Sequence, residues 1–412
     1  MASFSYWLLV MPQVTQIFNH KTLIRIAIII AFIQFTNALE YMAFTPIFSF
    51  MAEAFSVPVS FSGYVSGMYT LGSVLSGVAA FYWVDRFDKK RFLIQNMLLL
   101  GTLTFVSTFT TNFDALLALR FCAGLVGGTT MGVGTSILIN YSPVNMRGKM
   151  LATVIASFSM VSIVGMPAIL YFCTHYGWHI SLWSISFLCL LSLPLIAYFI
   201  PKDSAQSRAK NKLSIDAQTL LFASCNALVQ FSSMLIIPIL TPLMTHYLGA
   251  QQNQLPLLFL SGGIAGYLST KITGVLTSRF SALMLSTIST LLFVLSLLIP
   301  AAGYHNAVLF ITLFLGASYS RLVSSSSVTI QYPADEQRAS FSSLQTAIMS
   351  LITTFAFFLS SLLLPDHGIT TQNLDRLLAV CALAATGFPL MVMVLQKKLA
   401  KRIHQPDYVV ID

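Results

Sequence analysis

Long apolar segments separated by short polar connections run through the whole chain. A helix of about 20 mostly apolar residues is long enough to cross the hydrocarbon core of a bilayer. Segments of this kind recur twelve times, so we expect an all-α membrane protein with twelve transmembrane helices. They are predicted to begin near Ile24, Ser60, Phe92, Ala115, Lys149, His179, Ile215, Pro256, Ser281, Asn306, Ser340 and Leu374.

The positive charges lie mostly in alternate connections. Eighteen of the 22 Lys and Arg residues fall at the two termini or in every second connection, whereas the opposite set of connections carries only Arg376. Cytoplasmic connections of membrane proteins are enriched in Lys and Arg, so this bias predicts that both termini are cytoplasmic. The densest run of charge, Asp85 to Arg91, lies between the second and third segments.

The composition supports a membrane protein over a soluble one. The chain has 412 residues, of which 56% are hydrophobic and 8% are charged, whereas soluble domains carry about 25% charged residues. The net charge of +9 follows the connections between apolar segments, which indicates topology and not nucleic-acid binding. The five cysteines form no Cys-x-x-Cys pair, and residues 1–14 lack a signal-peptide pattern, so we predict no metal site, disulfide framework or cleaved leader.

The chain divides into two halves that resemble each other. A Tyr-to-Arg spacing of six residues precedes the fifth segment, at Tyr141 and Arg147, and the eleventh, at Tyr332 and Arg338. Repeated halves in a membrane protein are typical of transporters, with the binding site between the repeats. The expected division is an N-terminal six-helix bundle at 1–200, a basic cytoplasmic linker at 201–214 and a C-terminal six-helix bundle at 215–412.

The connection between the second and third segments carries Asp85, Arg86, Lys89 and Lys90. These four positions resemble the pattern Gly-x-x-x-Asp-Arg-x-Gly-Arg-Arg/Lys of the major facilitator superfamily. Phe81 and Asp88 stand where that pattern has its two glycines. Arg120, Gly124 and Gly127 match the fourth-segment pattern Arg-x-x-x-Gly-x-x-Gly, and Gly165-Met166-Pro167 is what remains of a fifth-segment glycine series. The whole chain therefore resembles this superfamily, specifically its twelve-span drug/proton antiporter branch.

This resemblance implies a secondary transporter with two pseudo-symmetric six-helix bundles that rock around a central site. It implies no enzymatic activity, no cofactor other than a proton gradient, and a monomer in the bacterial inner membrane. It also implies that Asp85, Arg86, Lys89 and Lys90 form a conformational latch with the start of the eleventh helix. A purely topological role for this charge cluster is the alternative. The chain lacks the Gly-x-x-x-x-Gly-Lys-Ser/Thr pattern of a built-in ATPase.

Glu40 is the acidic residue that lies well inside an apolar segment. An ionisable group at the centre of a membrane helix costs about 2.5–3.5 kcal/mol on insertion scales, so it normally faces a partner or a water-filled cavity. A carboxylate in such a place suits proton coupling, while a structural carboxylate bound to one partner is the alternative. By the resemblance, the first and fourth helices line a central cavity, which implies that Arg120 is near Glu40 and is either a proton-linked partner or part of a static ion pair.

Polar residues at helical spacing on the first and seventh segments are candidate substrate contacts. They are Gln34, Asn37 and Tyr41 on the first, Asn226 and Gln230 on the seventh, and the intramembrane cation Arg321 on the tenth. Hydrogen bonding between helices is the alternative for the neutral residues, and a structurally paired or snorkelling side chain is the alternative for Arg321.

Proton-coupled efflux of a small organic compound is the function that the resemblance favours. Proton-coupled uptake of a small metabolite or organic anion is the alternative, motivated by three cations against one acid inside the apolar segments. A third class is a transporter-like membrane sensor or chaperone. The expected partners are a small molecule and the lipid bilayer, and nucleic acid is not among them.

Overall fold

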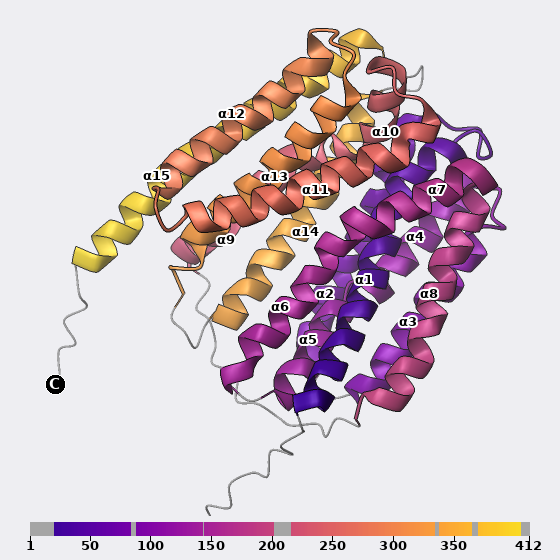
Figure 1. Ribbon diagram of the computed structural model, residues 1–412, viewed down its shortest axis with the longest axis horizontal. Coiled ribbons are helices and arrows are strands. Elements are labelled where there is room, and N and C mark those ends of the chain that lie inside the picture. The colour runs from indigo at the N-terminus through magenta and orange to yellow at the C-terminus, as the bar shows by residue number, and fades with distance from the viewer. Residues whose placement is uncertain are drawn as a thin grey trace, which may run out of the picture.

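The computed structural model of the protein describes residues 20–83, 88–142, 144–201, 216–333, 338–364 and 370–404. Within these ranges the chain is almost entirely helical (Figure 1). The helices are α1 (His20–Met51), α2 (Ser62–Trp83), α3 (Lys89–Ser107), α4 (Phe113–Gly127), α5 (Thr130–Tyr141), α6 (Val144–Met160), α7 (Met166–Tyr176), α8 (Trp178–Phe199), α9 (Ala217–Met234), α10 (Leu240–Pro242), α11 (Leu255–Leu276), α12 (Ala282–Ala301), α13 (Ala307–Thr329), α14 (Arg338–Leu363) and α15 (Thr371–His404).

The predicted all-α membrane architecture is confirmed. A helix begins within five residues of each of the twelve predicted starts. Ten helical segments in the described ranges are long and apolar enough to cross a membrane. The other two are α2, which is rich in serine, glycine and tyrosine, and α3, whose first turn carries Lys89, Lys90 and Arg91.

Three of the predicted spans are interrupted helices. The fourth span is α4 followed by α5, with turn residues between them, and the fifth passes from α6 through a π-helical segment, Val161–Gly165, into α7. The seventh continues from α9 through a 3₁₀ turn and α10 into a second π-helical segment, Leu243–Tyr247. Local π-helical bulges are frequent at functional sites, and irregular backbone at membrane depth is tolerated where protein or a cavity surrounds it.

Figure 1 shows α1 to α8, in indigo through magenta to pink, as one group and α9 to α15, in rose through orange to yellow, as another. The two groups meet chiefly where α2 packs on α14 and where α7 packs on α11. The Ser62 hydroxyl donates to the Pro238 carbonyl oxygen at 2.6 Å, and the Ser361 hydroxyl donates to the Ser60 carbonyl oxygen at 2.6 Å. These two contacts join residues at the start of α2 to the 3₁₀ turn Ile237–Ile239 after α9 and to the end of α14, so the groups are sealed together at that end.

Glycines at the end of α4 and in the turn that follows it permit close packing against α2. A Cβ atom added at Gly124 would lie 1.9 Å from the Tyr69 carbonyl oxygen, and one at Gly128 would lie 2.6 Å from the Ser73 Cα atom. The α2 and α4 backbones therefore touch. Gly132 is different, because an added Cβ atom there meets nothing within 4 Å.

Candidate functional site

A buried ion pair joins the first and fourth spans. Arg120 Nη1 of α4 bonds Glu40 Oε1 of α1, and both side chains are fully buried. The Thr104 hydroxyl of α3 donates to the same carboxylate oxygen at 3.2 Å. The other acids that the structure describes lie at or near helix ends, so Glu40 is the acid placed inside a span in that part of the chain.

Aromatic rings enclose the guanidinium of this pair. The Arg120 Cζ atom lies 3.7 Å from the centre of the Phe44 ring and 4.7 Å from that of Tyr69. Tyr69 in turn stacks on Tyr41, with ring centres 5.0 Å apart. Cation–π contacts of this kind contribute about 0.5–2 kcal/mol each, and most where water is excluded. Arg120 is therefore held by the carboxylate and by two ring faces.

The polar residues predicted on α1 lie beside this pair. The Gln34 side chain is fully buried, and its Nε2 atom donates to the Thr130 carbonyl oxygen at 3.1 Å. Asn37 and Tyr41 are half-buried. The interhelical hydrogen bonding that the sequence left open is thus present at Gln34.

Arg321 is fully buried, but it points into its own group of helices. Its Nη1 atom donates to the Ser232 hydroxyl of α9 at 2.8 Å, and its Cζ atom lies 4.5 Å from the centre of the Phe293 ring of α12 and 5.4 Å from that of Phe388 of α15. Its Nε atom donates to no described residue, and no described carboxylate pairs with it. The guanidinium is therefore a buried cation without a counter-ion in that part of the chain.

Asn226 and Gln230, the predicted contacts on α9, differ in surroundings. Asn226 is buried; it accepts a hydrogen bond from Ser325 and donates to Ser326 Oγ at 3.3 Å, both on α13. Gln230 is half-buried. Asn226 therefore joins α9 to α13.

Two members of the predicted latch, Asp85 and Arg86, lie outside the described residues. Lys89 is buried in the first turn of α3, and Lys90 Nζ donates to the Ala197 carbonyl oxygen in the last turn of α8 at 2.7 Å. Asp88 stands where the family pattern has glycine, and its side chain accepts hydrogen bonds from the backbone N–H groups of Lys90 and Arg91. It is thus the N-cap of α3, a role that aspartate fills well.

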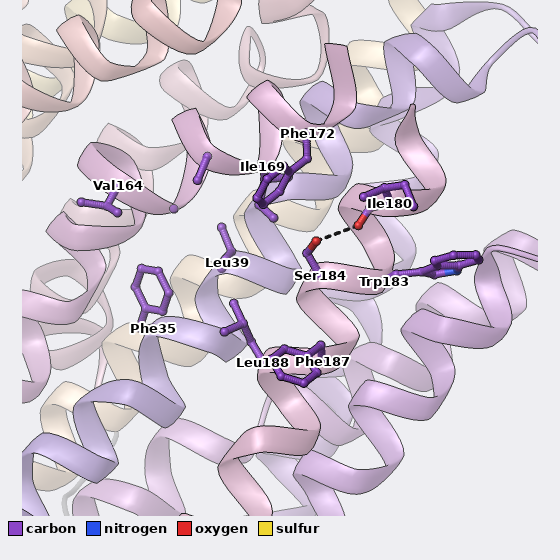
Figure 2. A pocket seen from close by; sticks show the side chains of 12 residues that line it. Phe35, Leu39, Val164, Ile169, Phe172, Ile180, Trp183, Ser184, Phe187 and Leu188 are labelled. Carbon is purple, nitrogen blue, oxygen red and sulfur yellow. Dashed lines mark hydrogen bonds between the residues drawn. The ribbon is translucent and has the colours of Figure 1, made fainter. Parts of the chain in front are cut away.

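An apolar cavity of about 510 Å³ lies between α1, the bulged fifth span and α8 (Figure 2). Its one hydroxyl-bearing side chain, Ser184, donates to the Ile180 carbonyl oxygen of its own helix at 2.8 Å. None of the predicted substrate contacts lines it. The lining residues are Phe35, Leu39, Val164, Gly165, Ala168, Ile169, Phe172, Ile180, Trp183, Ser184, Phe187 and Leu188.

Sequence reasoning missed three residues of the site. Phe44, Tyr69 and Thr104 contact the ion pair, but each is a residue type common in apolar segments, and nothing in the local pattern distinguishes Tyr69 or Thr104. One turn beyond Glu40 on the same helix, Phe44 is the residue that i, i+4 spacing would have found.

Residues 30–219 match the family model described as Major Facilitator Superfamily. Over 178 residues the chain is 24% identical to the 4-hydroxybenzoate transporter PcaK of Acinetobacter baylyi, covering 43% of this chain and 39% of that protein. It is 30% identical over 153 residues to the niacin transporter NiaP of the same organism, covering 37% and 32%. It is 24% identical over 186 residues to a probable sugar efflux transporter of Mannheimia succiniciproducens, covering 45% and 47%.

The match spans less than half the length of each of these relatives. The drug/proton antiporter branch is not confirmed, because these relatives include aromatic acid transporters. Among solved structures, a bacterial homologue of the human lysosomal transporter Spinster, inward-facing and unoccupied, has a TM-score of 0.72 at 14% identity. That likeness covers 93% of this chain and 99% of the other. Residues 30–219 thus match the Major Facilitator Superfamily model, and the chain shares its fold with the similar transporter of known structure.

Proposed function

We propose that the protein is a secondary transporter that moves a small organic acid, together with protons, by alternating access of its two groups of helices. The observation that carries this proposal is the fully buried Glu40–Arg120 pair between α1 and α4. Transporters named for 4-hydroxybenzoate and niacin among the relatives support a carboxylic acid as the substrate class.

The ion pair couples a proton to an anion by charge balance. While Glu40 is ionised, it neutralises Arg120 directly. A proton on Glu40 removes that negative charge and leaves the guanidinium buried without an anion, which is strongly unfavourable. A substrate carboxylate then supplies the missing charge, so proton and anion bind together and are released together.

The predicted substrate contacts remain part of the proposal. A planar aromatic acid can stack on Tyr41, whose ring already stacks on Tyr69. Gln34 and Asn37 on α1, Asn226 and Gln230 on α9, and the buried Arg321 supply polar groups from both halves. Arg321 has unused N–H donors toward an anion, because its Nε atom donates to no described residue.

The sealed end supports alternating access. By the predicted topology, the bonds Ser62–Pro238 and Ser60–Ser361 lie at the outer ends of their helices. The protein would then be closed to the outside and open toward the cytoplasm. The similar Spinster homologue is described as inward-facing, which agrees with this proposal.

A transport assay with purified protein in liposomes tests the function. With an inward proton gradient and radiolabelled 4-hydroxybenzoate as probe, we expect uptake accompanied by acidification of the lumen. In Glu40→Gln the gradient should no longer drive accumulation, while exchange of labelled for unlabelled probe persists. The matched control is Thr36→Val, which removes a buried hydroxyl that bonds only its own helix, at the Phe32 carbonyl oxygen. Gradient-driven accumulation in Glu40→Gln would refute proton coupling at this carboxylate.

Efflux is the second candidate, favoured by the similarity to a probable sugar efflux transporter. The same liposomes separate the two functions. Protons and probe enter together in a symporter, whereas in an antiporter an inward proton gradient drives pre-loaded probe outward.

We further propose that the chain is a monomer of the bacterial inner membrane with both termini cytoplasmic. Reporter enzymes fused at each terminus test the orientation.

We also propose that Asp85, Arg86, Lys89 and Lys90 act as a latch. In Asp85→Asn we expect slower transport with unchanged binding of the probe, and weaker binding would contradict the latch.

A further inference from the structure

One face of α1 carries polar side chains at Gln34, Asn37 and Glu40. Residues three apart on a helix lie on the same side, one turn above another. Each of the three has a buried oxygen that accepts no hydrogen bond from any residue the structure describes: Gln34 Oε1, Asn37 Oδ1 and Glu40 Oε2. Facing them, Arg120 has two buried nitrogens, Nε and Nη2, that donate to no described residue. Unused acceptors and donors therefore occur along one line of contact between α1 and α4, formed by Gln34, Asn37, Glu40 and Arg120, which we call the polar seam.

Glycines on the opposite side of the seam make room for these groups. A Cβ atom at Gly127 would lie 2.9 Å from Asn37 Oδ1 and 2.1 Å from the Tyr69 hydroxyl. A Cβ atom at Gly134 would lie 3.0 Å from Gln34 Nε2. The two glycines stand on either side of the break between α4 and α5, so any larger residue there would displace an amide or a hydroxyl of the seam.

The polar seam continues from Gln34 to α3. Gln34 donates to the carbonyl oxygen of Thr130, the first residue of α5. Asn96 of α3 donates to the Thr129 hydroxyl at 2.9 Å and reaches the Thr130 hydroxyl at 3.5 Å. Asn96 lies seven residues from the start of α3 at Lys89, about 10 Å at a rise of 1.5 Å per residue. The seam thus runs from Glu40 toward the end at which α1 and α3 begin, which the topology predicts to be cytoplasmic.

We propose that Asn37, Gln34, Thr130 and Asn96 hold a chain of water molecules that carries protons between Glu40 and the cytoplasmic end of the N-terminal helices. This inference rests on the proposed function, because it requires that Glu40 exchanges a proton. Buried polar groups without a protein partner are commonly satisfied by ordered water, which makes two to four hydrogen bonds. The amides and hydroxyls orient the water and do not themselves ionise in this role. In this path Gln34 and Asn37 are positioning residues for the proton, a role separate from the substrate contacts proposed above.

The proton transfer balances without a further reactant. A water molecule beside Glu40 gives its proton to the carboxylate and receives one from the next water molecule, and the last takes its proton from the cytoplasm. Among the described residues, the ionisable groups around the carboxylate of Glu40 come from four helices. Arg120 comes from α4, Tyr69 from α2, Tyr41 from α1 and Cys189 from α8. Arg120 is the permanent charge among these, and it bonds the carboxylate that the path serves.

Infrared spectroscopy of the full-length protein in liposomes tests the path without a transported substrate. The carboxyl band of Glu40 is identified by its loss in Glu40→Gln, and its rate of change is followed after a pH jump on the cytoplasmic side. In Asn37→Leu and Gln34→Leu we expect a rate about tenfold lower, the effect of a barrier raised by about 1.4 kcal/mol. Asn37→Ser, which can still bind water, should restore most of the rate, and Thr36→Val should leave it unchanged.

The outcomes separate the path from the proposed function. If the band does not respond to pH in the wild-type protein, proton coupling at Glu40 is wrong. If it responds, and Asn37→Leu and Gln34→Leu react at the wild-type rate, the path is wrong while the coupling stands. If the carboxyl band of Glu40 changes only after a pH jump on the outer side, the path is also wrong. Gly127→Ala gives a second, independent variant, because its methyl group would displace Asn37 or Tyr69. It should also slow the change of the Glu40 carboxyl band after the pH jump.

Discussion

Replacing Arg120 by methionine leaves Glu40 as a buried carboxylate without its cation. In the described part of the structure, Glu40 then keeps one hydrogen bond, from the Thr104 hydroxyl at 3.2 Å. Removing one partner of a buried ion pair costs about 3–5 kcal/mol, because the remaining charge is uncompensated. We therefore expect Arg120→Met to lower the free energy of unfolding by about that amount at pH 8.

The opposite variant, Glu40→Gln, should cost less. Arg120 keeps the faces of Phe44 and Tyr69, at 3.7 Å and 4.7 Å from its Cζ atom, and the glutamine carbonyl oxygen still accepts a hydrogen bond. Each ring contributes about 0.5–2 kcal/mol that Glu40→Gln keeps and Arg120→Met loses, so we expect a loss near the lower end of about 3–5 kcal/mol. The double variant carries neither charge. Its stability should lie within about 1 kcal/mol of the wild type, since uncharged replacements of a buried pair are often neutral.

Unfolding by SDS in mixed micelles measures all four proteins at pH 8 and pH 5. At pH 5 the cost of Arg120→Met should shrink, because a proton on the carboxyl group removes the buried charge, whereas the cost of Glu40→Gln should not change. Single-variant costs that simply add in the double variant would refute the pairing. An equal cost of Arg120→Met at both pH values would refute the claim that Glu40 takes up a proton when it loses its partner.

Gly124→Ala should destabilise the protein by about 1–3 kcal/mol, because its methyl group would lie 1.9 Å from the Tyr69 carbonyl oxygen. In the control Gly132→Ala the methyl group has open space. The melting temperature in detergent should therefore fall for Gly124→Ala and not for Gly132→Ala. Asp216 is the N-cap of α9, and hydrogen bonds from Thr219 hold the pKa of its carboxyl group below the usual 3.8. The stability that this cap contributes is therefore fully present above pH 3.8. It is lost as the pH falls through the lowered pKa. When the cap is lost at low pH, the backbone amides in the first turn of α9 should exchange faster. In Asp216→Ala these amides should exchange fast at every pH. Hydrogen-exchange measurements test both expectations. Arg321→Met removes a buried cation that has no described carboxylate, so the free energy of unfolding should hold or rise; a clear loss would make the guanidinium a structural partner.

The twelve helices were predictable because each requires only a local apolar run of sufficient length. Their interruptions were not. The segment Val161–Gly165 is uniformly apolar or small, and its π-helical geometry accompanies close contact with α11, where a Cβ atom at Gly263 would lie 2.6 Å from the Ser162 carbonyl oxygen. Such a contact depends on residues about a hundred positions apart, which no local pattern records.

The site was predictable in part for the same reason. Glu40 was recognisable as an acid in an apolar run, but its distance to Arg120 came only through the family resemblance, because 80 residues separate the two. Asp88 carried a local signal that the family pattern obscured. An aspartate directly before a helix is an ordinary N-cap, and the structure shows that role where the pattern had suggested only a missing glycine.

The charges buried in the described spans bear on the substrate. Glu40, Arg120 and Arg321 are fully buried, while Lys271 is exposed near the end of α11. With Glu40 ionised, the three buried groups have a net charge of +1. A proton on Glu40 raises this to +2, and a bound monocarboxylate restores +1. One proton carried with one monoanion therefore leaves the buried charge of the loaded protein equal to that of the empty one, so loading adds no further uncompensated buried charge. A neutral or cationic substrate would not restore this balance, which is the electrostatic reason to prefer an organic acid.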